Sequence, residues 1–254
     1  MKTIAIIGGS GLTEFDELEI IQRHDPLSFS FTSDSAASLG VPSSEIVEGI
    51  LNGIRLLFLA RHGLPNAIPP HKINYRANLV ALQELGADFI FAVNAVGGIH
   101  SDATPGHISV PHQIIDYTHG REHTFFDGIY KPLDHIDFTY PYDESLRQML
   151  IEGLSKQALN HGYSDFGIYG ATQGPRLETL AEINRLEKDG CDLVGMTGMP
   201  EAALARELNM PYASVCLTVN LAAGKSKEMA PIEEIREILD TGMNEIKILL
   251  TNIL

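Results

Sequence analysis

Residues 3–12 read TIAIIGGSGL, an apolar, β-branched run followed at once by a glycine-rich turn. Such a run favours an extended strand, and paired glycines end it, so we expect a first strand at Thr3–Ile7. The turn can direct backbone N–H groups and the Ser10 hydroxyl at an anion, or it can be a purely structural tight turn. A dinucleotide-binding fingerprint would require a third glycine at the position of Glu14.

Short β-branched runs continue to alternate with longer segments of helical period. Further strands are expected at Ile54–Leu59, Asp88–Val93, His107–Ile115, Gly167–Thr172, Leu193–Met196 and Ala213–Val219. Helices are expected at Tyr75–Leu85, Asp143–Asn160, Leu177–Lys188, Pro200–Leu208 and from Pro231 to near the C-terminus. This alternation predicts an α/β fold with a mixed or parallel sheet covered by helices. A length of 254 residues suits one domain that spans residues 1–254.

Composition narrows the classes of partner. The formal net charge of −15 provides no basic field for a phosphodiester backbone, so we expect no nucleic-acid partner. No stretch approaches the roughly 20 apolar residues that span a bilayer, so we expect no membrane partner and a cytoplasmic location. Cys191 and Cys216 lie in apolar runs without metal-binding spacing, which predicts buried residues in a reducing compartment and neither a disulfide nor a zinc site.

Residues 116–142 interrupt the alternation. This segment carries His119, His123 and His135 without helical or strand period. Loops of this length in compact domains are usually functional or interfacial, so we expect an active-site or subunit-contact loop; the alternative is a surface excursion.

Two further predicted strands end in groups that suit an anion. Arg61 and His62 close one strand, and α/β folds usually place ligands at strand ends. Asn94–Gly98 closes another and offers backbone amides, including that of Ala95. Three such ends suggest a common anion pocket, although a surface arginine and ordinary strand-ending glycines explain each one separately.

Three later positions have two interpretations each. Glu178 is expected in the first turn of a helix, as a dipole-stabilised carboxylate or a ligand contact. Thr197 suits an N-cap, and its hydroxyl and N–H can also bind an anion. Asn220, at the end of an apolar strand, can form a turn or can offer one donor and one acceptor to a heteroaromatic base.

In their order and spacing these pieces resemble the trimeric nucleoside phosphorylase family, which includes purine nucleoside phosphorylase and methylthioadenosine phosphorylase. The likeness runs from Ile4 to about Leu239. It rests on GGSGL at 8–12, ARHG at 60–63, residues 94–98, FDG at 126–128, QGPRLET at 173–179, GMTGMPE at 195–201 and the strand ending at Asn220.

The resemblance implies a nucleoside phosphorylase fold with a mixed, mostly parallel central sheet and a pentosyltransferase of purine salvage. Inorganic phosphate is then the co-substrate, without a metal or other cofactor. It also implies a homotrimer in which a loop of one subunit covers a neighbour's sugar pocket, with His135 in that role. Met196 would lie against the ribose, and phosphate would be held by Ser10, Arg61, His62, the Ala95 amide and Thr197.

Glu178 and Asn220 separate the branches of the family. Adenine-specific members carry serine at the position of Glu178 and aspartates at those of Asn220 and Ala222, whereas enzymes for 6-oxopurines carry glutamate and asparagine. Glu178 can accept from a protonated N1, while Asn220 can donate to O6 and accept from N7–H. The resemblance therefore implies a 6-oxopurine nucleoside as substrate, with these two residues at its base.

The 5′ end of the sugar points to a methylthio group. Members that bind a 5′-hydroxyl place a histidine near the start of the last helix, where this chain has Ile232. The expected reaction is phosphorolysis of S-methyl-5′-thioinosine to hypoxanthine and 5-methylthioribose 1-phosphate. Leu177 departs from the phenylalanine that relatives often stack on the base. The rivals are an inosine/guanosine phosphorylase, a methylthioadenosine phosphorylase and a nonenzymatic nucleotide-binding protein.

Overall fold

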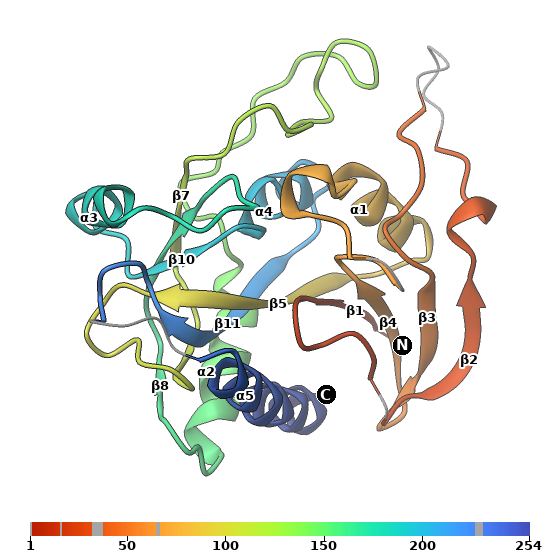
Figure 1. Cartoon of the computed structure of the whole chain (residues 1–254). Coiled ribbons are helices and arrows are strands. Elements are labelled where there is room, and N and C mark those ends of the chain that lie inside the picture. Colours follow the sequence, from red (N-terminus) through yellow and green to blue (C-terminus); the bar gives the residue numbers. More distant parts are fainter. Residues whose placement is uncertain (1, 16, 32–37, 65–66, 227–230) are drawn as a thin grey trace.

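A twisted sheet runs through the middle of the molecule, with helices on both faces (Figure 1). The computed structural model describes residues 2–15, 17–31, 38–64, 67–226 and 231–254. Within these ranges the sheet has 11 strands: β1 Thr3–Gly8, β2 Glu19–His24, β3 Ile46–Leu51, β4 Ile54–Ala60, β5 Phe89–Gly98, β6 Ile108–Ser109, β7 Gln113–Asp116, β8 Tyr163–Ser164, β9 Ile168–Ala171, β10 Leu193–Gly195 and β11 Tyr212–Leu221.

The helices of the described ranges are α1 Tyr75–Glu84, α2 Glu144–Lys156, α3 Leu180–Lys188, α4 Gly198–Glu207 and α5 Ile232–Ile253, with short 3-10 turns at Pro26–Ser28 and Pro70–Lys72. None of these helices is long and apolar enough to cross a membrane.

The strand order is β2-β3-β4-β1-β5-β10-β9-β7, with β11 also paired to β5, β6 to β11 and β8 to β6. Among the described pairings, β1–β4, β1–β5, β5–β11, β9–β10, β7–β9 and β6–β8 are parallel, and the others are antiparallel. The predicted α/β class with a mixed, mostly parallel sheet is confirmed.

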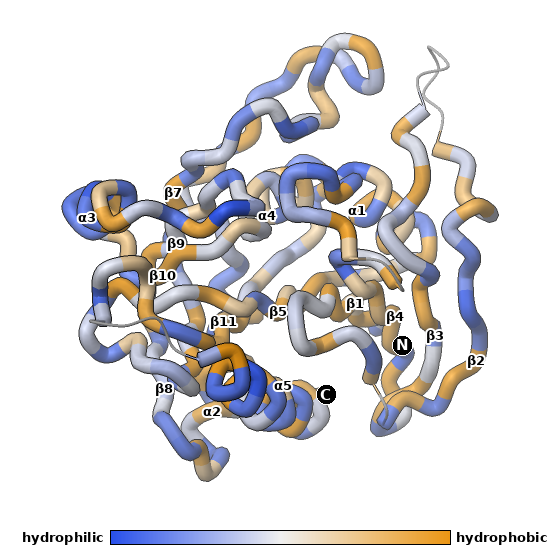
Figure 2. Tube along the Cα trace, viewed as in Figure 1, coloured by the Kyte–Doolittle hydropathy of each residue, from blue (hydrophilic) through white to orange (hydrophobic). Residues whose placement is uncertain are grey.

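Each face of the sheet has its own core, because side chains along a strand alternate between the two faces. Ala5 and Ile7 of β1 pack in a cluster that includes residues of α1 and α4. Ile4 and Ile6 pack in a second cluster with residues of α2 and α5. Figure 2 shows hydrophobic residues concentrated in the strands at the centre of the molecule. The first strand is therefore buried on both sides, as its continuous apolar run indicates.

Two predicted strands differ from the observed elements by more than two residues at an end. The expected strand His107–Ile115 is wrong as one element: β6 pairs with β11 and β8, whereas β7 pairs with β9. Between them stands Pro111, which has no N–H for a ladder, and the chain changes partners there. The strand predicted at Asp88–Val93 continues to Gly98, so residues 94–98 lie inside β5 rather than after it.

The helix predicted from Leu177 starts at Leu180. Thr179 is its N-cap and forms a capping box with Glu182, whose carboxylate accepts from the Thr179 N–H at 2.7 Å. This reciprocal pair satisfies two free N–H groups and fixes the first turn. Glu178 consequently precedes the helix, which corrects its predicted place in the first helical turn.

Strands β2 and β3 were not predicted. They form an antiparallel extension beside β4, and β3 turns into β4 through Asn52 and Gly53, which have φ of 51° and 80°. Asn-Gly between two apolar runs is a strong sequence sign of a tight hairpin. That sign is present here and would have identified β3.

Candidate active site

The sheet is interrupted along one edge of β5, where part of the strand has no neighbouring strand among the described residues. In the described register, β1 pairs with residues 89–92 of β5, and β10 meets the same strand only at Gly97 and Gly98. On this edge of the described sheet, residues 93–96 have no partner strand, although β11 pairs with them on the other edge. The carboxyl ends of β1 and β10 approach these residues from opposite directions. Strand ends of this kind are the usual ligand position in α/β sheets.

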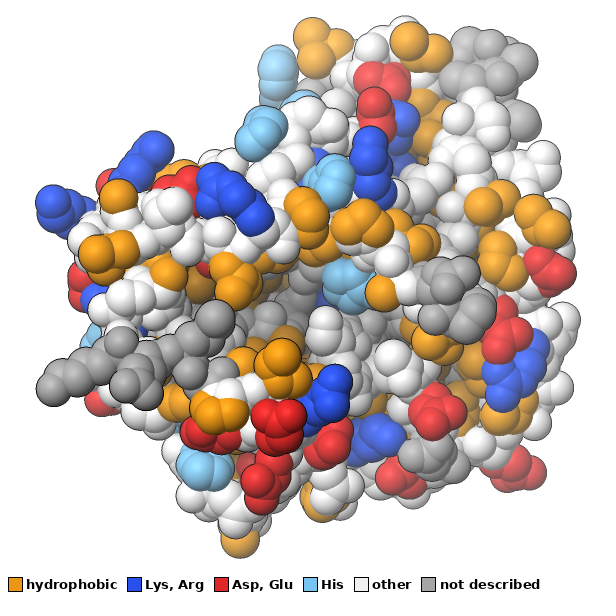
Figure 3. All heavy atoms as spheres, viewed as in Figure 1, with side chains coloured by type: hydrophobic (Ala, Val, Ile, Leu, Met, Phe, Trp, Pro, Cys, Tyr) orange, Lys and Arg blue, Asp and Glu red, His pale blue; other side chains and the backbone are white. Residues whose placement is uncertain are grey.

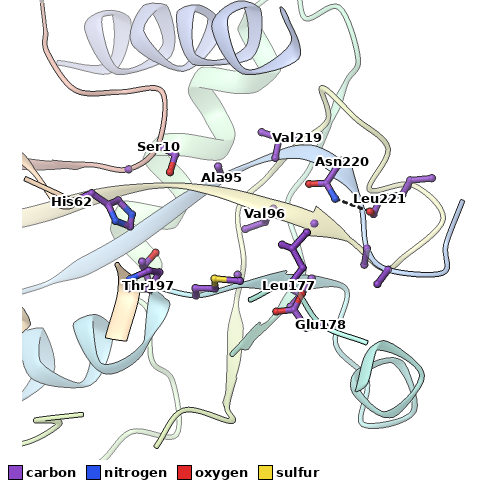
Figure 4. Close-up of a pocket in the computed structure, with 18 of the residues that line it drawn as sticks. Ser10, His62, Ala95, Val96, Leu177, Glu178, Thr197, Val219, Asn220 and Leu221 are labelled. Carbon is purple, nitrogen blue, oxygen red and sulfur yellow. Dashed lines mark hydrogen bonds between the residues drawn. The ribbon is translucent and has the colours of Figure 1, made fainter. Parts of the chain in front are cut away.

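A cavity of about 700 Å³ occupies this interruption. Figure 3 shows a hollow on this face of the molecule with hydrophobic side chains around it. The lining brings together nine of the residues that the sequence singled out: Ser10, Arg61, His62, Ala95, Leu177, Glu178, Met196, Thr197 and Asn220. Figure 4 shows Ser10, His62 and Thr197 toward one end, and Glu178 and Asn220 toward the other.

The glycine-rich turn packs closely against the backbone of β5 and the side chain of Arg61. A Cβ on Gly9 would lie 2.6 Å from the Val93 carbonyl oxygen and 2.9 Å from Arg61 Nη1. Any larger residue would push the turn out of place, so the glycine is required by this approach. Ser10 follows it and is exposed at the cavity.

Arg61 is fully buried and its fork is already occupied. Its Nε and Nη2 donate to the two carboxylate oxygens of Glu201 at 2.7 and 2.8 Å, and Nη1 donates to Val93 O at 2.9 Å. Burial alone would lower the pKa of Arg61, but the charge and hydrogen bonds of Glu201 outweigh it and raise that pKa. The interpretation of Arg61 as a surface residue is wrong. Its charge is offset by Glu201, so an anion here would rely largely on oriented dipoles.

His62 is half-buried, with Nδ1 2.9 Å from the carbonyl oxygen of Ile68. A carbonyl only accepts, so Nδ1 carries the proton in this contact. Desolvation by burial lowers the pKa of His62 and favours the neutral ring. The ring is thereby held in one orientation at the cavity wall.

Thr197 occupies the N-cap position of α4 but makes no side-chain capping bond. Its hydroxyl donates to Asn94 Oδ1 at 2.9 Å, and Asn94 Nδ2 donates to Ser214 at 2.6 Å. The N–H groups of Thr197 and Gly198 donate to the Tyr169 hydroxyl, both at 3.3 Å. Because the Thr197 side chain makes no capping bond, its expected capping role is wrong, and its predicted contact with an anion stays a prediction. The Asn94 side chain is buried and connects Thr197 to Ser214.

The other end of the cavity presents a carboxylate and an amide. The Thr172 hydroxyl donates to Glu178 Oε1 at 2.6 Å and so fixes that carboxylate. The Asn220 amide, at the end of β11, donates to Leu221 O at 2.7 Å, leaving one N–H and its oxygen for other partners. Leu177 lies beside them and is largely exposed, at 62%.

Two predicted contacts lie outside the lining of this cavity. His135 is exposed in the irregular segment 116–142, and its N–H donates to Asp134 Oδ1 at 2.8 Å. Ile232, the first residue of α5, is 64% exposed. Neither side chain belongs to the cavity within one chain. The segment begins at the last residue of β7, and residues 117–142 form no helix or strand, as predicted; the segment projects beyond α1 and α4 (Figure 1).

Comparisons with known proteins identify the family. A family model described as the phosphorylase superfamily matches residues 3–254. The chain belongs to the phosphorylase superfamily. A protein of Pseudomonas syringae pv. tomato named as a probable S-methyl-5′-thioinosine phosphorylase is 51% identical over 254 residues, covering 100% of this chain and 99% of the relative. The 6-oxopurine nucleoside phosphorylase of Pyrococcus furiosus is 40% identical, covering 97% of this chain and 89% of its own.

Solved phosphorylase structures share the fold. Methylthioadenosine phosphorylase from Schistosoma mansoni in complex with adenine superposes with a TM-score of 0.89 at 29% identity, covering 100% of this chain and 91% of that one. As a phosphorylase the chain is a pentosyltransferase that uses phosphate as co-substrate. The expected family resemblance is confirmed, while the roles of individual site residues stay predictions.

Sequence reasoning assigned no role to Glu201, Thr172, Asn94 or Tyr169. Glu201 lies in the quoted segment GMTGMPE, and Thr172 directly precedes the quoted segment QGPRLET. The partner of Glu201 is distant in sequence, and the turn between Thr172 and Glu178 decides whether those two side chains meet. Glu201 pairs with Arg61 across 140 positions of sequence. A lone buried glutamate beside a buried arginine is recognisable only when the fold brings them together.

Proposed function

We propose that the cavity binds inorganic phosphate and a 6-oxopurine nucleoside together and cleaves the N-glycosidic bond. The nucleoside that fits best is S-methyl-5′-thioinosine, which would give hypoxanthine and 5-methylthioribose 1-phosphate. The observation that carries this proposal is the placement of Glu178 and Asn220 at one end of the same cavity whose other end holds Ser10, His62 and Thr197 (Figure 4).

The base end has the hydrogen-bonding set of a 6-oxopurine. Glu178, fixed by Thr172, accepts from N1–H, while Asn220 donates to O6 or accepts from N7–H. Adenine presents an unprotonated N1, so the lone pair of N1 would face the acceptor-only carboxylate. The names of the relatives from Pseudomonas syringae and Pyrococcus furiosus support the same base class.

The anion end would hold phosphate against the anomeric carbon. The proposed contacts are Ser10, Arg61, His62, the Ala95 amide and Thr197, with Met196 against the ribose. As the C–N bond lengthens, the sugar gains positive charge and the purine gains negative charge. Phosphate offsets the first and a hydrogen bond between Asn220 and N7 stabilises the second, while the shared cavity supplies proximity. Glu178 orients the base and is not a nucleophile.

We further propose a cytoplasmic homotrimer in which residues 1–254 act as one domain. The two buried, free cysteines fit a reducing compartment. His135 would reach a neighbour's sugar pocket, in keeping with its exposure and with its absence from the lining of its own chain's cavity.

A second candidate is an inosine/guanosine phosphorylase. The position of Ile232 favours this candidate. The methylthio group was expected to pack against Ile232, but this side chain is exposed and lies outside the cavity lining of its own chain. Phosphate-dependent release of base from methylthioinosine, inosine and methylthioadenosine separates the possibilities. Preferred cleavage of methylthioinosine supports the proposal, equal cleavage of inosine favours the second candidate, and preference for methylthioadenosine would refute both.

A further inference from the structure

A buried arginine in the irregular segment connects separate walls of the cavity. Arg121 is 8% exposed. Its guanidinium donates to four backbone oxygens, to the Gln173 side chain and to the Tyr75 hydroxyl: Thr172 O at 3.1 Å, Gln173 O at 2.8 Å, Met196 O at 2.9 Å, Met199 O at 2.6 Å, Gln173 Oε1 at 3.2 Å and Tyr75 Oη at 3.4 Å.

None of these partners, within the ranges that the structure describes, is a carboxylate. A buried cation is costly unless its environment compensates it, and here carbonyl dipoles and the Tyr75 ring, 5.8 Å away, do so. Met199 has φ −118° and ψ 140° inside α4, so its carbonyl leaves the helical pattern and points to Arg121 instead. The guanidinium is thus matched to one backbone arrangement.

The partners of Arg121 belong to three walls of the cavity. Thr172 and Gln173 lead into the segment that carries Glu178. Met196 and Met199 flank Thr197 at the start of α4. The Tyr75 hydroxyl donates to Pro70 O at 2.9 Å, and Pro70 lines the cavity. A rigid five-donor fork can hold such segments at fixed spacing, which a flexible ammonium cannot do.

We propose that Arg121 is a positioning residue that fixes the spacing between the Glu178 wall and the Met196 wall. This inference rests on the proposed function, in which these walls bind the base and the sugar. Ser10 and Ala95 belong to the β1 turn and to β5, neither of which contacts Arg121 through the hydrogen bonds above. Thr197 is the one proposed phosphate contact that lies between residues held by Arg121, so loss of Arg121 weakens nucleoside binding more than phosphate binding.

The test compares Arg121→Lys and Arg121→Gln with the unmodified protein. The KM for methylthioinosine is measured at saturating phosphate, and the KM for phosphate at saturating nucleoside. We expect the nucleoside KM to rise at least about 10-fold in both variants, since displacement of a binding wall by about 1 Å has large effects. The phosphate KM should rise by a clearly smaller factor, because only Thr197 among the proposed phosphate contacts lies between residues held by Arg121.

Arg76→Gln is the matched control. Arg76 binds the same irregular segment, through Glu122 at 3.0 Å and Asp127 at 2.8 Å. These ion pairs involve neither the Glu178 wall nor the Met196 wall. It should retain both KM values. If it raised the nucleoside KM as much as Arg121→Gln does, the effect would belong to loop anchoring in general and the proposal would be overturned.

Gln173→Ala covers the case in which the Arg121 variants do not fold. This variant keeps the Arg121 cation and removes one of its acceptors. The nucleoside KM should therefore again rise more than the phosphate KM, but by a smaller factor than in the Arg121 variants. Unchanged nucleoside KM in every folded variant, with active unmodified protein, overturns the positioning role alone. An unmodified protein that releases no base from any of the three nucleosides overturns the proposed function, and this inference with it.

Discussion

Arg61 and Glu201 form a buried bidentate pair beneath the cavity, with side chains 0% and 1% exposed. The Tyr212 hydroxyl also donates to Glu201 Oε1, at 2.8 Å. The pair joins the end of β4 to α4, two elements that are distant in sequence. Its first role is therefore to compensate two buried charges, and any contact of Arg61 with phosphate comes in addition.

We expect Arg61→Met to destabilise the protein by about 3–5 kcal/mol, because it leaves Glu201 buried without its cation. Glu201→Met should cost a similar amount. The double variant should lose much less than the sum, since neither charge then remains unpaired. Urea unfolding of the four proteins measures this cycle. Additive losses would show that the two residues are not energetically coupled. Any Arg61 variant that stays folded should also need a higher phosphate concentration to reach half of its maximal rate.

The first strand, the sheet class and nine of the residues that line the cavity could be predicted from the sequence. Residues 4–7 are apolar at every position, and strand-ending glycines collect at one sheet edge because parallel strands share a direction. The change of partner at Pro111 was missed, since the apolar pattern on both sides of it looks continuous. Only tertiary packing decides that β6 joins β11 and β7 joins β9.

Partners that lie far apart in sequence could not be predicted. The pairing of Arg61 with Glu201 was not expected, and the predicted contact of Arg61 with phosphate stays a prediction. Arg121 stood in a segment recognised as irregular, and its partners belong to two turns about 50 and 75 residues away. Such contacts depend on how loops fold over the sheet, and no local period encodes them.

Thr172→Val tests the support of Glu178. The hydroxyl at 2.6 Å from Glu178 Oε1 stabilises the carboxylate in place, and a hydrogen bond to a charged group is worth about 1.5–3 kcal/mol. We expect kcat/KM for methylthioinosine to fall roughly 10- to 100-fold. Thr218→Val is the matched control, because the buried Thr218 hydroxyl has no hydrogen-bond partner among the described residues. It should keep activity and be neutral or stabilising, whereas equal losses in both variants would contradict the assignment.

His107 predicts a pH dependence of stability. Burial lowers its pKa in the folded protein, where Nε2 lies 2.8 Å from Ser164 Oγ. In the unfolded chain its pKa is about 6.5. At a pH between the two pKa values, the unfolded state therefore binds a proton that the folded state does not bind. Its contribution is complete above about pH 6.5 and is lost as pH falls through the lower folded pKa.

Urea unfolding between about pH 5 and 8 measures this effect. His107→Gln should flatten the loss of stability on the acidic side, by at most about 1.4 kcal/mol per pH unit for one proton. Replacing the exposed His119 by glutamine should leave the profile unchanged. If His107→Gln retained the full acidic slope, other groups would account for it.

The proposed shared site predicts complementation between subunits. Asn220→Ala and His135→Ala should each be inactive or nearly so, whereas mixed oligomers can contain pockets that combine an intact Asn220 with a neighbour's His135. Mixing the two purified variants under conditions of demonstrated subunit exchange should restore part of the activity. Two inactive variants that exchange subunits yet never regain activity would exclude a contribution of His135 across the interface.

Base selection is the sharpest expectation from Glu178 and Asn220. A 6-oxopurine gives Glu178 a donor at N1, whereas adenine turns the lone pair of an unprotonated N1 toward the acceptor-only carboxylate. Sites built on specific hydrogen bonds discriminate strongly, because the wrong partner leaves buried groups unpaired. We therefore expect kcat/KM for methylthioinosine to exceed that for methylthioadenosine by at least roughly 100-fold, or about 2.7 kcal/mol in the transition state.

Substitution of the base residues should narrow or reverse this ratio. Glu178→Ser with Asn220→Asp removes the acceptor for N1–H and supplies one for the adenine amino group and a protonated N7. Ala222, a buried residue of the lining, is the place for a second aspartate, so Ala222→Asp is added in a triple variant. Glu178→Gln is the control of similar size: it should lower methylthioinosine cleavage without creating an adenine enzyme. Equal efficiency of the unmodified protein on both nucleosides would refute the 6-oxopurine assignment and leave membership of the phosphorylase superfamily intact.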